Sequence, residues 1–222
     1  MKKITVVMVA MFAISCFGFT PQKKTKVIFF GDSITELGVQ TRNDSGKGYV
    51  LKIDSLCKAE GKSALYDFVG AGVSGNKVYD LYLRLEDDVL SKNPDVVVIY
   101  IGVNDVWHKA TSGTGTDPDK FERFYNAIIK KLKEKNIRVI LCTPAVIGEK
   151  NDNTNQQDGD LNQYSNVIRN IAQKNNLTLV DLRKMFVDYS KLHNPENKDR
   201  NILTRDRVHL NEKGNQTVAE KV

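Results

Sequence analysis

Residues 27–35 read VIFFGDSIT, and the rest of the chain is organised around this segment. Its first four residues are β-branched or aromatic, which is typical of a buried β-strand. The strand pattern breaks at Gly31, and Ser33 follows two residues later. In a parallel α/β sheet, ligands bind at the carboxyl ends of the strands. The hydroxyl of Ser33 therefore either faces a cleft or simply caps the helix that follows.

Downstream of this segment, strand and helix patterns alternate. The predicted strands cover residues 26–30, 65–69, 95–101, 137–142 and 177–181, and the predicted helices cover about 48–60, 77–91, 118–135, 160–175 and a short last segment from Glu212. The third and fourth strands are nearly continuous aliphatic runs, as expected of strands buried on both faces. This alternation predicts an α/β fold: a doubly wound, five-stranded parallel sheet between two layers of helices.

The segment 118–135 has the clearest helical pattern. Pro118 takes the first helical position, and Asp117 is predicted to cap the helix. Apolar side chains recur at three- and four-residue intervals and form one stripe for packing on the sheet: Phe121, Phe124, Tyr125, Ile128 and Leu132. Two long segments, 102–117 and 143–159, are predicted to be loops that follow strand ends and border the cleft.

The first 25 residues have the order of an export signal. Two lysines precede an apolar run over residues 4–19, which is short for a membrane-spanning helix. The sequence AISC, ending at Cys16, resembles a bacterial lipoprotein box, with cleavage before Cys16 and a lipid on that cysteine. We expect a signal peptide over residues 1–25, one folded domain over 26–222, and a periplasmic, secreted or outer-surface bacterial protein. The alternative is an uncleaved N-terminal anchor.

Composition and charge narrow the class of protein. A chain of 222 residues with 41% apolar and 27% charged residues fits one soluble α/β domain. The net charge is +6, but five lysines lie in the first 26 residues, which contain no acid. Without them, 28 basic residues face 27 acidic ones. The folded part is therefore near neutral, and nothing in its charge favours a nucleic-acid partner.

Cysteines and histidines give no sign of a cofactor. Outside the leader, only Cys57 and Cys142 remain, and nothing in their spacing argues for a disulfide. With three histidines and two scattered cysteines, no metal-ligand cluster is visible. We expect neither a metal nor another cofactor.

The chain offers Ser33 a base near its C-terminal end. A serine hydroxyl is a poor nucleophile unless a base takes its proton and a third group orients that base. In the segment DRVH, Asp206 and His209 are three residues apart and can share one face of a turn. The carboxylate can accept from one ring N–H and leave the other nitrogen free as the base. We prefer His209 to His108 because only His209 has an acidic partner ready, and His193 is interpreted as loop surface.

A tetrahedral intermediate also needs hydrogen-bond donors for its negative oxygen. After the second strand, residues 70–75 read GAGVSG, whose backbone N–H groups can approach a ligand closely. After the third strand, residues 102–105 read GVND, and Asn104 can donate its amide N–H. Ser33, Gly72 and Asn104 thus follow the first three strands, whose carboxyl ends form one rim in an open parallel sheet.

The glycine-rich segment has a rival interpretation. Residues 70–75 match the G-x-G-x-x-G pattern of dinucleotide-binding proteins. However, they follow the second strand rather than the first, and the acid about twenty residues on, Asp95, begins a strand instead of ending one. A P-loop is also disfavoured, because Asn76 precedes Lys77 and Val78 stands in place of the Ser or Thr that holds magnesium.

Four segments resemble the sequence blocks of the SGNH/GDSL hydrolase family, in the family's order: residues 31–35, Gly72, residues 102–105 and residues 206–209. The resemblance covers essentially the whole exported domain. It implies a flavodoxin-like α/β/α fold with Ser33 as nucleophile, His209 as base and Asp206 as its partner. It also implies an oxyanion hole formed by the Ser33 N–H, the Gly72 N–H and Nδ2 of Asn104.

One position departs from the family pattern. The second block commonly carries Asn where this chain has Gly70. The change affects how the loop of Gly72 is held but leaves the donor in place. The chain also has no Gly-x-Ser-x-Gly segment, which argues against the α/β-hydrolase family.

These features predict an exported serine esterase that hydrolyses carboxylic esters through an acyl-enzyme. No long aliphatic lining or amphipathic lid is evident, which favours short acyl groups such as acetyl esters of carbohydrates. Trp107 either walls the acyl or sugar pocket or belongs to the core. The expected partners are small-molecule or glycan esters, with membrane contact only through a lipid at Cys16. The alternatives are an acyltransferase with the same triad and a non-catalytic carbohydrate-binding domain.

Overall fold

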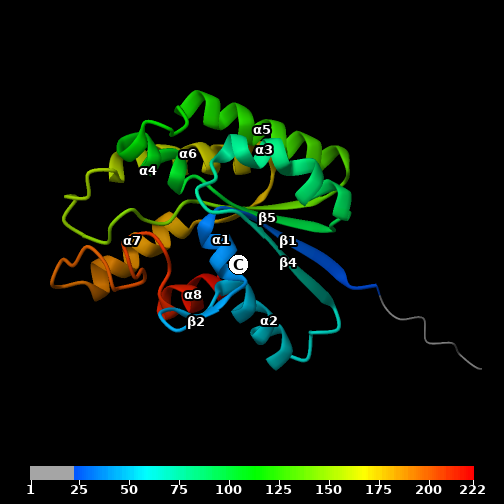
Figure 1. Ribbon diagram of the computed structural model, residues 1–222, viewed down its shortest axis with the longest axis horizontal. Helices are drawn as coiled ribbons and strands as arrows, with labels where there is room; N and C mark the ends of the chain where they lie inside the picture. The colour runs from blue at the N-terminus through cyan, green and yellow to red at the C-terminus, as the bar shows by residue number, and fades with distance from the viewer. Residues whose placement is uncertain (1–22) are drawn as a thin grey trace, which may run out of the picture.

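The computed structural model describes residues 23–222, so the predicted cleavage and lipidation site at Cys16 lies outside the described residues. A sheet runs through the middle of the molecule (Figure 1). Its strands are β1 (Thr25–Gly31), β4 (Tyr66–Gly72), β5 (Val96–Tyr100), β6 (Arg138–Cys142) and β7 (Thr178–Val180). They lie in the order β4-β1-β5-β6-β7, and every neighbouring pair is parallel. The predicted five-stranded parallel sheet is confirmed.

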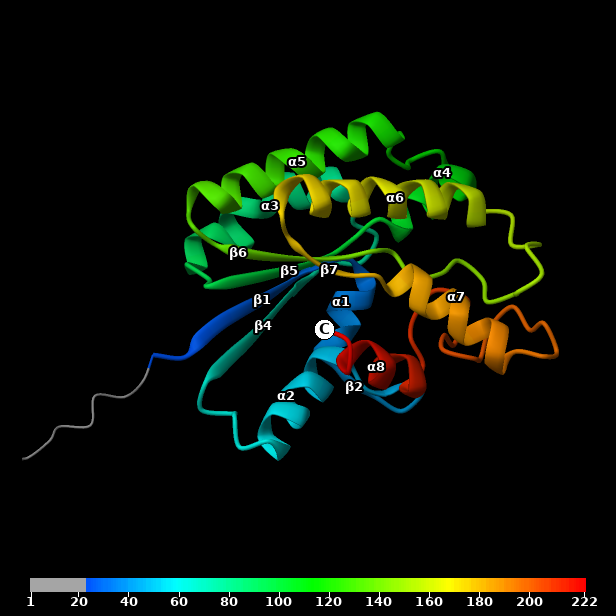
Figure 2. The same cartoon turned by 180° about the vertical axis from the view of Figure 1, so that it is seen from behind.

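Helices cover both faces of this sheet, as the two opposite views show (Figures 1 and 2). One face carries α3 (Val78–Asp88), α4 (Val103–Ser112), α5 (Pro118–Glu134) and α6 (Asp158–Asn175), and the other carries α1 (Ser33–Gly38), α2 (Tyr49–Ala59), α7 (Leu182–His193) and α8 (Glu212–Ala219). A short 3₁₀ turn, η1 (Leu90–Lys92), follows α3. The predicted three-layer architecture is therefore confirmed. In the described part of the chain, no helix is both long and apolar enough to cross a membrane.

The strand order reverses at β1. The chain passes from β1 to β4 on one side and then to β5 on the other. In open α/β sheets, ligands bind outside the carboxyl ends of the strands at such a reversal. Residues 27–31 of β1 and all of β5 are buried, with Ile28, Phe30, Val97 and Ile99 each 0% exposed. The residues that follow β1 and β5 therefore start from fixed positions beside each other.

The predicted stripe on α5 packs into the core, because Phe121, Tyr125, Ile128 and Leu132 are all fully buried. Asp117 is the residue before the helix, but its side chain accepts no helix N–H. It pairs with Lys109 at 2.9 Å instead. The predicted capping bond is wrong because a lysine on the preceding helix takes the carboxylate.

The prediction that residues 102–117 form a loop is also wrong, because most of them form α4. Gly102 begins this helix with a φ of +126°, a backbone conformation that favours glycine, and Gly113 ends it with a φ of +68°. Val103 and Val106 bury the side that faces the sheet. The helix escapes detection because its last turn is polar and the Gly/Thr-rich residues beyond it resemble a loop.

The sequence also leaves α7 and a small hairpin unpredicted. The side chain of Asp181 caps α7 by accepting the N–H of Lys184 at 3.1 Å, and Leu182 and Phe186 anchor the helix in the core. The hairpin pairs β2 (Thr41–Arg42) with β3 (Gly46–Lys47). The hairpin strands have two residues each, too few for a repeated pattern, whereas α7 does carry apolar residues at helical spacing (Leu182, Met185, Phe186 and Tyr189), so its omission is an error of the prediction.

Candidate active site

Ser33 is the first residue of α1, directly after the end of β1. Gly31 permits the close approach of β5, because a Cβ at this position would lie 2.3 Å from the carbonyl oxygen of Tyr100. Asp32 is the N-cap, and its side chain accepts the N–H of Ile34 at 2.9 Å. The capping role considered for Ser33 thus belongs to Asp32, and the serine hydroxyl is left for another partner.

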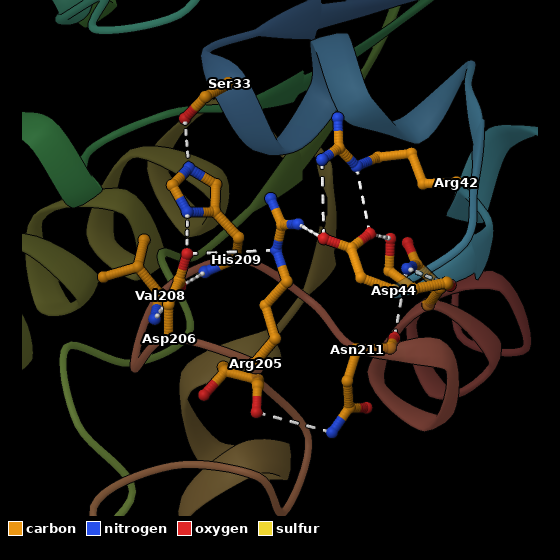
Figure 3. A network of polar contacts seen from close by, with 11 residues as sticks. Ser33, Arg42, Asp44, Arg205, Asp206, Val208, His209 and Asn211 are labelled. Carbon is orange, nitrogen blue, oxygen red and sulfur yellow. Dashed lines mark hydrogen bonds and ion pairs between the residues drawn. The ribbon is translucent and has the colours of Figure 1, made fainter.

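That partner is the imidazole of His209, which is 176 positions away in the sequence. Nε2 of His209 lies 2.9 Å from Oγ of Ser33, and Nδ1 lies 2.8 Å from a carboxylate oxygen of Asp206. Figure 3 shows the Ser33 hydroxyl, the His209 ring and the Asp206 carboxylate joined one after another by hydrogen bonds. When Nδ1 donates its hydrogen to the carboxylate, the lone pair of Nε2 can accept the serine proton.

The second oxygen of Asp206 holds the turn that carries the histidine. Oδ1 accepts the N–H of Val208 at 3.2 Å and the N–H of His209 at 2.8 Å. Burial favours the neutral acid, but the hydrogen bonds from the backbone and ring of His209 outweigh it and lower the pKa of Asp206 below its ordinary value. Asp206 is therefore a carboxylate at neutral pH and can orient the ring.

Glu149, in the loop after β6, supports the segment that leads into this turn. Its buried carboxylate accepts the backbone N–H groups of Ile202 at 2.9 Å, Leu203 at 2.7 Å and Thr204 at 3.0 Å. The residue directly before it, Gly148, also donates its N–H to the carbonyl oxygen of Arg207 at 2.9 Å. Sequence reasoning misses Glu149 because its partners are more than fifty positions away.

A charged cluster joins the β2–β3 hairpin to the same region (Figure 3). Asp44 accepts a hydrogen bond from Arg42 at 3.1 Å and pairs with Arg205. Nε of Arg205 in turn lies 3.9 Å from the carboxylate of Asp206. The bond from Arg42 is the main reason why the pKa of Asp44 falls to about 2. The hairpin thus borders the site with charged, partly exposed side chains.

Asn104 is buried near the start of α4, at the carboxyl end of β5. Its Nδ2 donates to the main-chain carbonyl oxygen of Asn76 at 3.1 Å. An amide nitrogen carries two hydrogens, so the second remains for a ligand. The contact places the Asn104 amide against the turn between β4 and α3.

The two glycines of that region have different surroundings. Gly72 packs closely against α1, because a Cβ there would lie 2.1 Å from the backbone nitrogen of Glu36. Gly75 adopts a left-handed φ of +78° with no atom nearer than 3.8 Å to its Cβ position. Among the described residues, no acceptor is found for the N–H of Gly75, and Asn76, the contact of Asn104, follows it directly. Within the segment 70–75, for which the sequence names Gly72, the structure therefore adds Gly75 as a candidate donor.

The departure from the family pattern at Gly70 has a local explanation. A Cβ at this position would lie 2.5 Å from Cγ1 of Val39, the residue that follows α1. Any larger side chain at position 70 requires Val39 to move. In this chain, a valine thus fills the space that an Asn side chain would need.

The other two histidines have no contact with Ser33. His108 lies on α4 beside Trp107, with ring centroids 5.8 Å apart, and burial lowers its pKa. In residues 23–222, the His108 ring makes no hydrogen bond to a carboxylate. His193 ends α7, and its ring lies 4.2 Å from that of Tyr189. Trp107 is half-buried against the core, so its side chain is shared between packing and the exposed surface.

Two buried carboxyl groups flank the site along the chain. Asp32 precedes Ser33, and Asp105 follows Asn104. Asp105 accepts the N–H of Val78 at 3.1 Å and so fixes the start of α3. Burial raises the pKa of each carboxyl to about 7. At neutral pH the pair therefore carries less negative charge than two exposed carboxylates would.

The cysteines, histidines and acidic residues of the described region show no arrangement that suggests a cofactor site. Within residues 23–222, no group of three or more His, Cys, Asp or Glu side chains is arranged to hold a metal ion. Cys57 and Cys142 are both free. Burial raises the pKa of the Cys142 thiol to about 12, so this residue acts as an apolar side chain.

Known proteins resemble this chain in both sequence and structure. Residues 29–217 match the model of the GDSL-like lipase/acylhydrolase family. An acetylxylan esterase of Geobacillus stearothermophilus is 31% identical over 207 residues, which covers 87% of this chain and 90% of that protein. The crystal structure of the acetyl xylan esterase AlAXEase is 62% identical, with a TM-score of 0.84, and the match covers 88% of this chain and 96% of that one.

Solved variants of the Geobacillus enzyme add a further likeness. One is described as a catalytic mutant with a serine replaced by alanine; it is 30% identical to this chain, with a TM-score of 0.77, and the match covers 89% of this chain and 91% of that one. Other catalytic mutants of that enzyme replace a histidine or an aspartate. These are the three residue types that meet at Ser33 in the present structure.

Proposed function

Because this chain belongs to the GDSL-like lipase/acylhydrolase family and is a carboxylic ester hydrolase, we propose that it removes acetyl groups from acetylated carbohydrates with Ser33, His209 and Asp206 as its triad. The observation that carries the proposal is the continuous chain of hydrogen bonds from Ser33 Oγ to His209 at 2.9 Å and from His209 to Asp206 at 2.8 Å. The acetylxylan esterase relatives support the choice of substrate class.

In the first half of the reaction, Oγ of Ser33 attacks the ester carbonyl carbon while Nε2 of His209 takes the hydroxyl proton. The carbonyl π electrons move to the oxygen, which becomes the oxyanion. When the tetrahedral intermediate collapses, the bond to the sugar oxygen breaks, and the sugar hydroxyl leaves with the proton from Nε2. Ser33 then carries the acetyl group.

In the second half, a water molecule takes the place of the alcohol. His209 removes a proton from the water, the resulting hydroxide oxygen attacks the acetyl carbon, and acetic acid is released as the proton returns to Ser33. Asp206 stays ionised throughout and stabilises the imidazolium, which is consistent with the lowered pKa of its carboxyl.

Three donors are proposed for the oxyanion. The Ser33 N–H stands at the start of α1, where the first N–H groups of a helix have no intrahelical partner. Asn104 offers its second amide hydrogen. For the third donor the sequence predicts Gly72, but we favour the Gly75 N–H, because Asn104 contacts the turn of Gly75 and Gly72 is packed against α1.

Location outside the cytoplasm is part of the proposal. The residue order of positions 1–25 supports export, and polymeric acetylated carbohydrate is met outside the cell. Fractionation of the producing cells tests this point. Recovery of the full-length, unprocessed chain in the cytoplasm would contradict it.

The substrate class is tested by acetate release. Purified protein is incubated with acetylated xylan and, in parallel, with nitrophenyl esters of increasing acyl length. We expect acetate from the polysaccharide and the highest kcat/KM with the acetyl ester. A preference for long acyl chains, or transfer of acetyl to an added alcohol in place of release as acetate, would refute the acetyl-carbohydrate hydrolase proposal.

A further inference from the structure

Arg84 extends from α3 towards the carboxyl ends of β1 and β4, and its side chain is 16% exposed. Its guanidinium lies over the ring of Phe30, 4.5 Å from the centroid. An arginine stacked on an aromatic face in this way holds a fixed orientation. None of the reaction steps above uses this residue.

Each nitrogen of the Arg84 guanidinium has an acceptor at short range. Nη2 donates to the carbonyl oxygen of Gly31 at 2.7 Å, and Nη1 donates to that of Ala71 at 3.0 Å. Nε donates to Oδ1 of Asn76 at 2.7 Å. Nη1 also pairs with Asp88, one turn along α3, at 2.6 Å. One planar cation therefore joins the end of β1, the end of β4 and the turn after β4.

These acceptors adjoin the groups of the proposed oxyanion hole. Gly31 is two residues before Ser33, and Asn76 directly follows Gly75. The side chain of Asn76 accepts from Arg84, and its main-chain carbonyl accepts from Nδ2 of Asn104. A single residue thus connects the guanidinium to the Asn104 amide.

The turn of residues 73–76 has few other attachments to the sheet. The N–H of Val73 donates to the carbonyl oxygen of Gly31 at 3.2 Å, and both the N–H and the hydroxyl of Ser74 donate to the carboxylate of Glu36 on α1. Within the turn, Nζ of Lys77 donates to the carbonyl oxygen of Gly75 at 3.0 Å. Donors of an oxyanion hole act well only when they are held within about 0.5 Å of the productive geometry. The charge-assisted bond from the stacked arginine adds a restraint at Asn76, the last residue of the turn, and joins that residue to the ends of β1 and β4.

We propose that Arg84 is a positioning residue for the oxyanion hole. It holds the turn of residues 73–76 against the end of β1, so that the Gly75 N–H and the Asn104 amide stay aimed at the oxygen that develops charge. The proposal rests on the proposed function, because the donors matter only if Ser33 attacks an ester.

The first experiment compares Arg84→Met with a matched control, Arg169→Met. Arg169 makes a comparable two-point ion pair with Asp181 at 2.8 Å beside β7. With nitrophenyl acetate, we expect kcat of Arg84→Met to fall by about 10- to 100-fold, less than the loss of a whole donor, while KM changes little. Arg169→Met should keep its kcat. Equal losses in both variants, or an unchanged kcat in Arg84→Met, would overturn the proposal.

The second experiment does not require Arg84 to be replaced. Asn76→Ala removes the acceptor of Nε but keeps the main-chain carbonyl, and Asn76→Asp restores an acceptor. We expect kcat to fall by roughly tenfold in Asn76→Ala and to recover in Asn76→Asp. An Asn76→Ala variant with wild-type kcat would contradict the link through this residue.

A double-mutant cycle separates this role from general stability. If Arg84 acts through Asn104, the loss of kcat in Arg84→Met combined with Asn104→Ala is smaller than the product of the two single losses. Multiplicative losses would overturn that link. Ser33→Ala is the reference variant. If Ser33→Ala keeps full turnover, both the proposed function and the role of Arg84 are refuted. If Ser33→Ala is inactive but Arg84→Met is fully active, only the role of Arg84 is refuted.

Discussion

At the residue scale, the site combines a charged carboxyl with two carboxyls that burial holds closer to neutrality. Hydrogen bonds lower the pKa of Asp206, whereas burial raises the pKa of Asp32 and of Asp105 to about 7. Charge is thus kept where a carboxylate orients an imidazole and reduced where a carboxyl is enclosed in the interior. The difference follows from how many N–H groups each carboxyl accepts and how deeply it is buried.

The buried carboxyl of Asp105 should give the protein a measurable pH dependence of stability. Its pKa is higher in the folded than in the unfolded state, so the folded state binds more protons between about pH 4 and pH 7, and the free energy of unfolding falls as pH rises through that window. Asp105→Asn removes the titrating carboxyl and therefore its contribution to the pH dependence of stability. Urea unfolding at both ends of the window should show a smaller loss of stability in the variant, and parallel pH dependence in the two proteins would refute the assignment.

The amide of Asn104 is the donor whose role is simplest to test. Asn104→Ala should lower kcat by about 10²- to 10³-fold, the usual loss for one side-chain oxyanion donor. Asn126→Ala is the control, because Asn126 is exposed on α5 and donates only to its own helix. Steady-state kinetics with nitrophenyl acetate checks both variants, and unchanged turnover in Asn104→Ala would exclude the amide as a donor.

At the element scale, loops rather than helices hold the histidine in place. The loop after β6 reaches the segment before Asp206 through Glu149, and the β2–β3 hairpin reaches it through Asp44 and Arg205. Such contacts join parts of the chain that are far apart in the sequence. They explain how an irregular segment can hold the His209 ring beside Ser33.

Glu149→Gln tests this support. The substitution turns one acceptor oxygen into a donor that faces a backbone N–H of residues 202–204, which should cost about 1–3 kcal/mol of stability. We also expect a lower kcat, because the turn of His209 loses part of its support. Thermal unfolding and kinetics check the result against Glu86→Gln, an exposed change on α3. Equal stability and kcat in the two variants would contradict the role of Glu149.

Local patterns explain which elements the sequence could predict. The strands and α5 carry long, regular apolar patterns, and Asp206 and His209 form a motif within one turn. By contrast, α4 lies between a strand end and a Gly/Thr-rich segment that resembles a loop, and the preference for Gly75 over Gly72 depends on the conformation of a turn. The helix α7 has a regular apolar spacing and could have been predicted. Arg84 and Glu149 act on backbone groups far away in sequence, so no motif reveals them.

At the scale of the whole molecule, the site exists because the strand order reverses at β1. Ser33 follows β1, Gly75 follows β4 and Asn104 follows β5, and these three strands are neighbours in the sheet. The histidine comes from the segment before α8, near the other end of the described chain. The alternation of strands and helices predicts that residues after these three strands share one rim, although it names Gly72 in place of Gly75. Only the folded chain shows that His209 reaches Ser33.

The most direct test of this account measures acetate release by wild type and by Ser33→Ala under identical conditions. His209→Ala serves as a second variant of the same hydrogen-bonded pair. We expect kcat to fall by roughly 10⁴-fold or more in Ser33→Ala and to fall little further when His209→Ala is added, because the residues of a triad act as one unit. A Ser33→Ala protein that releases acetate at a rate within about tenfold of wild type would contradict the account.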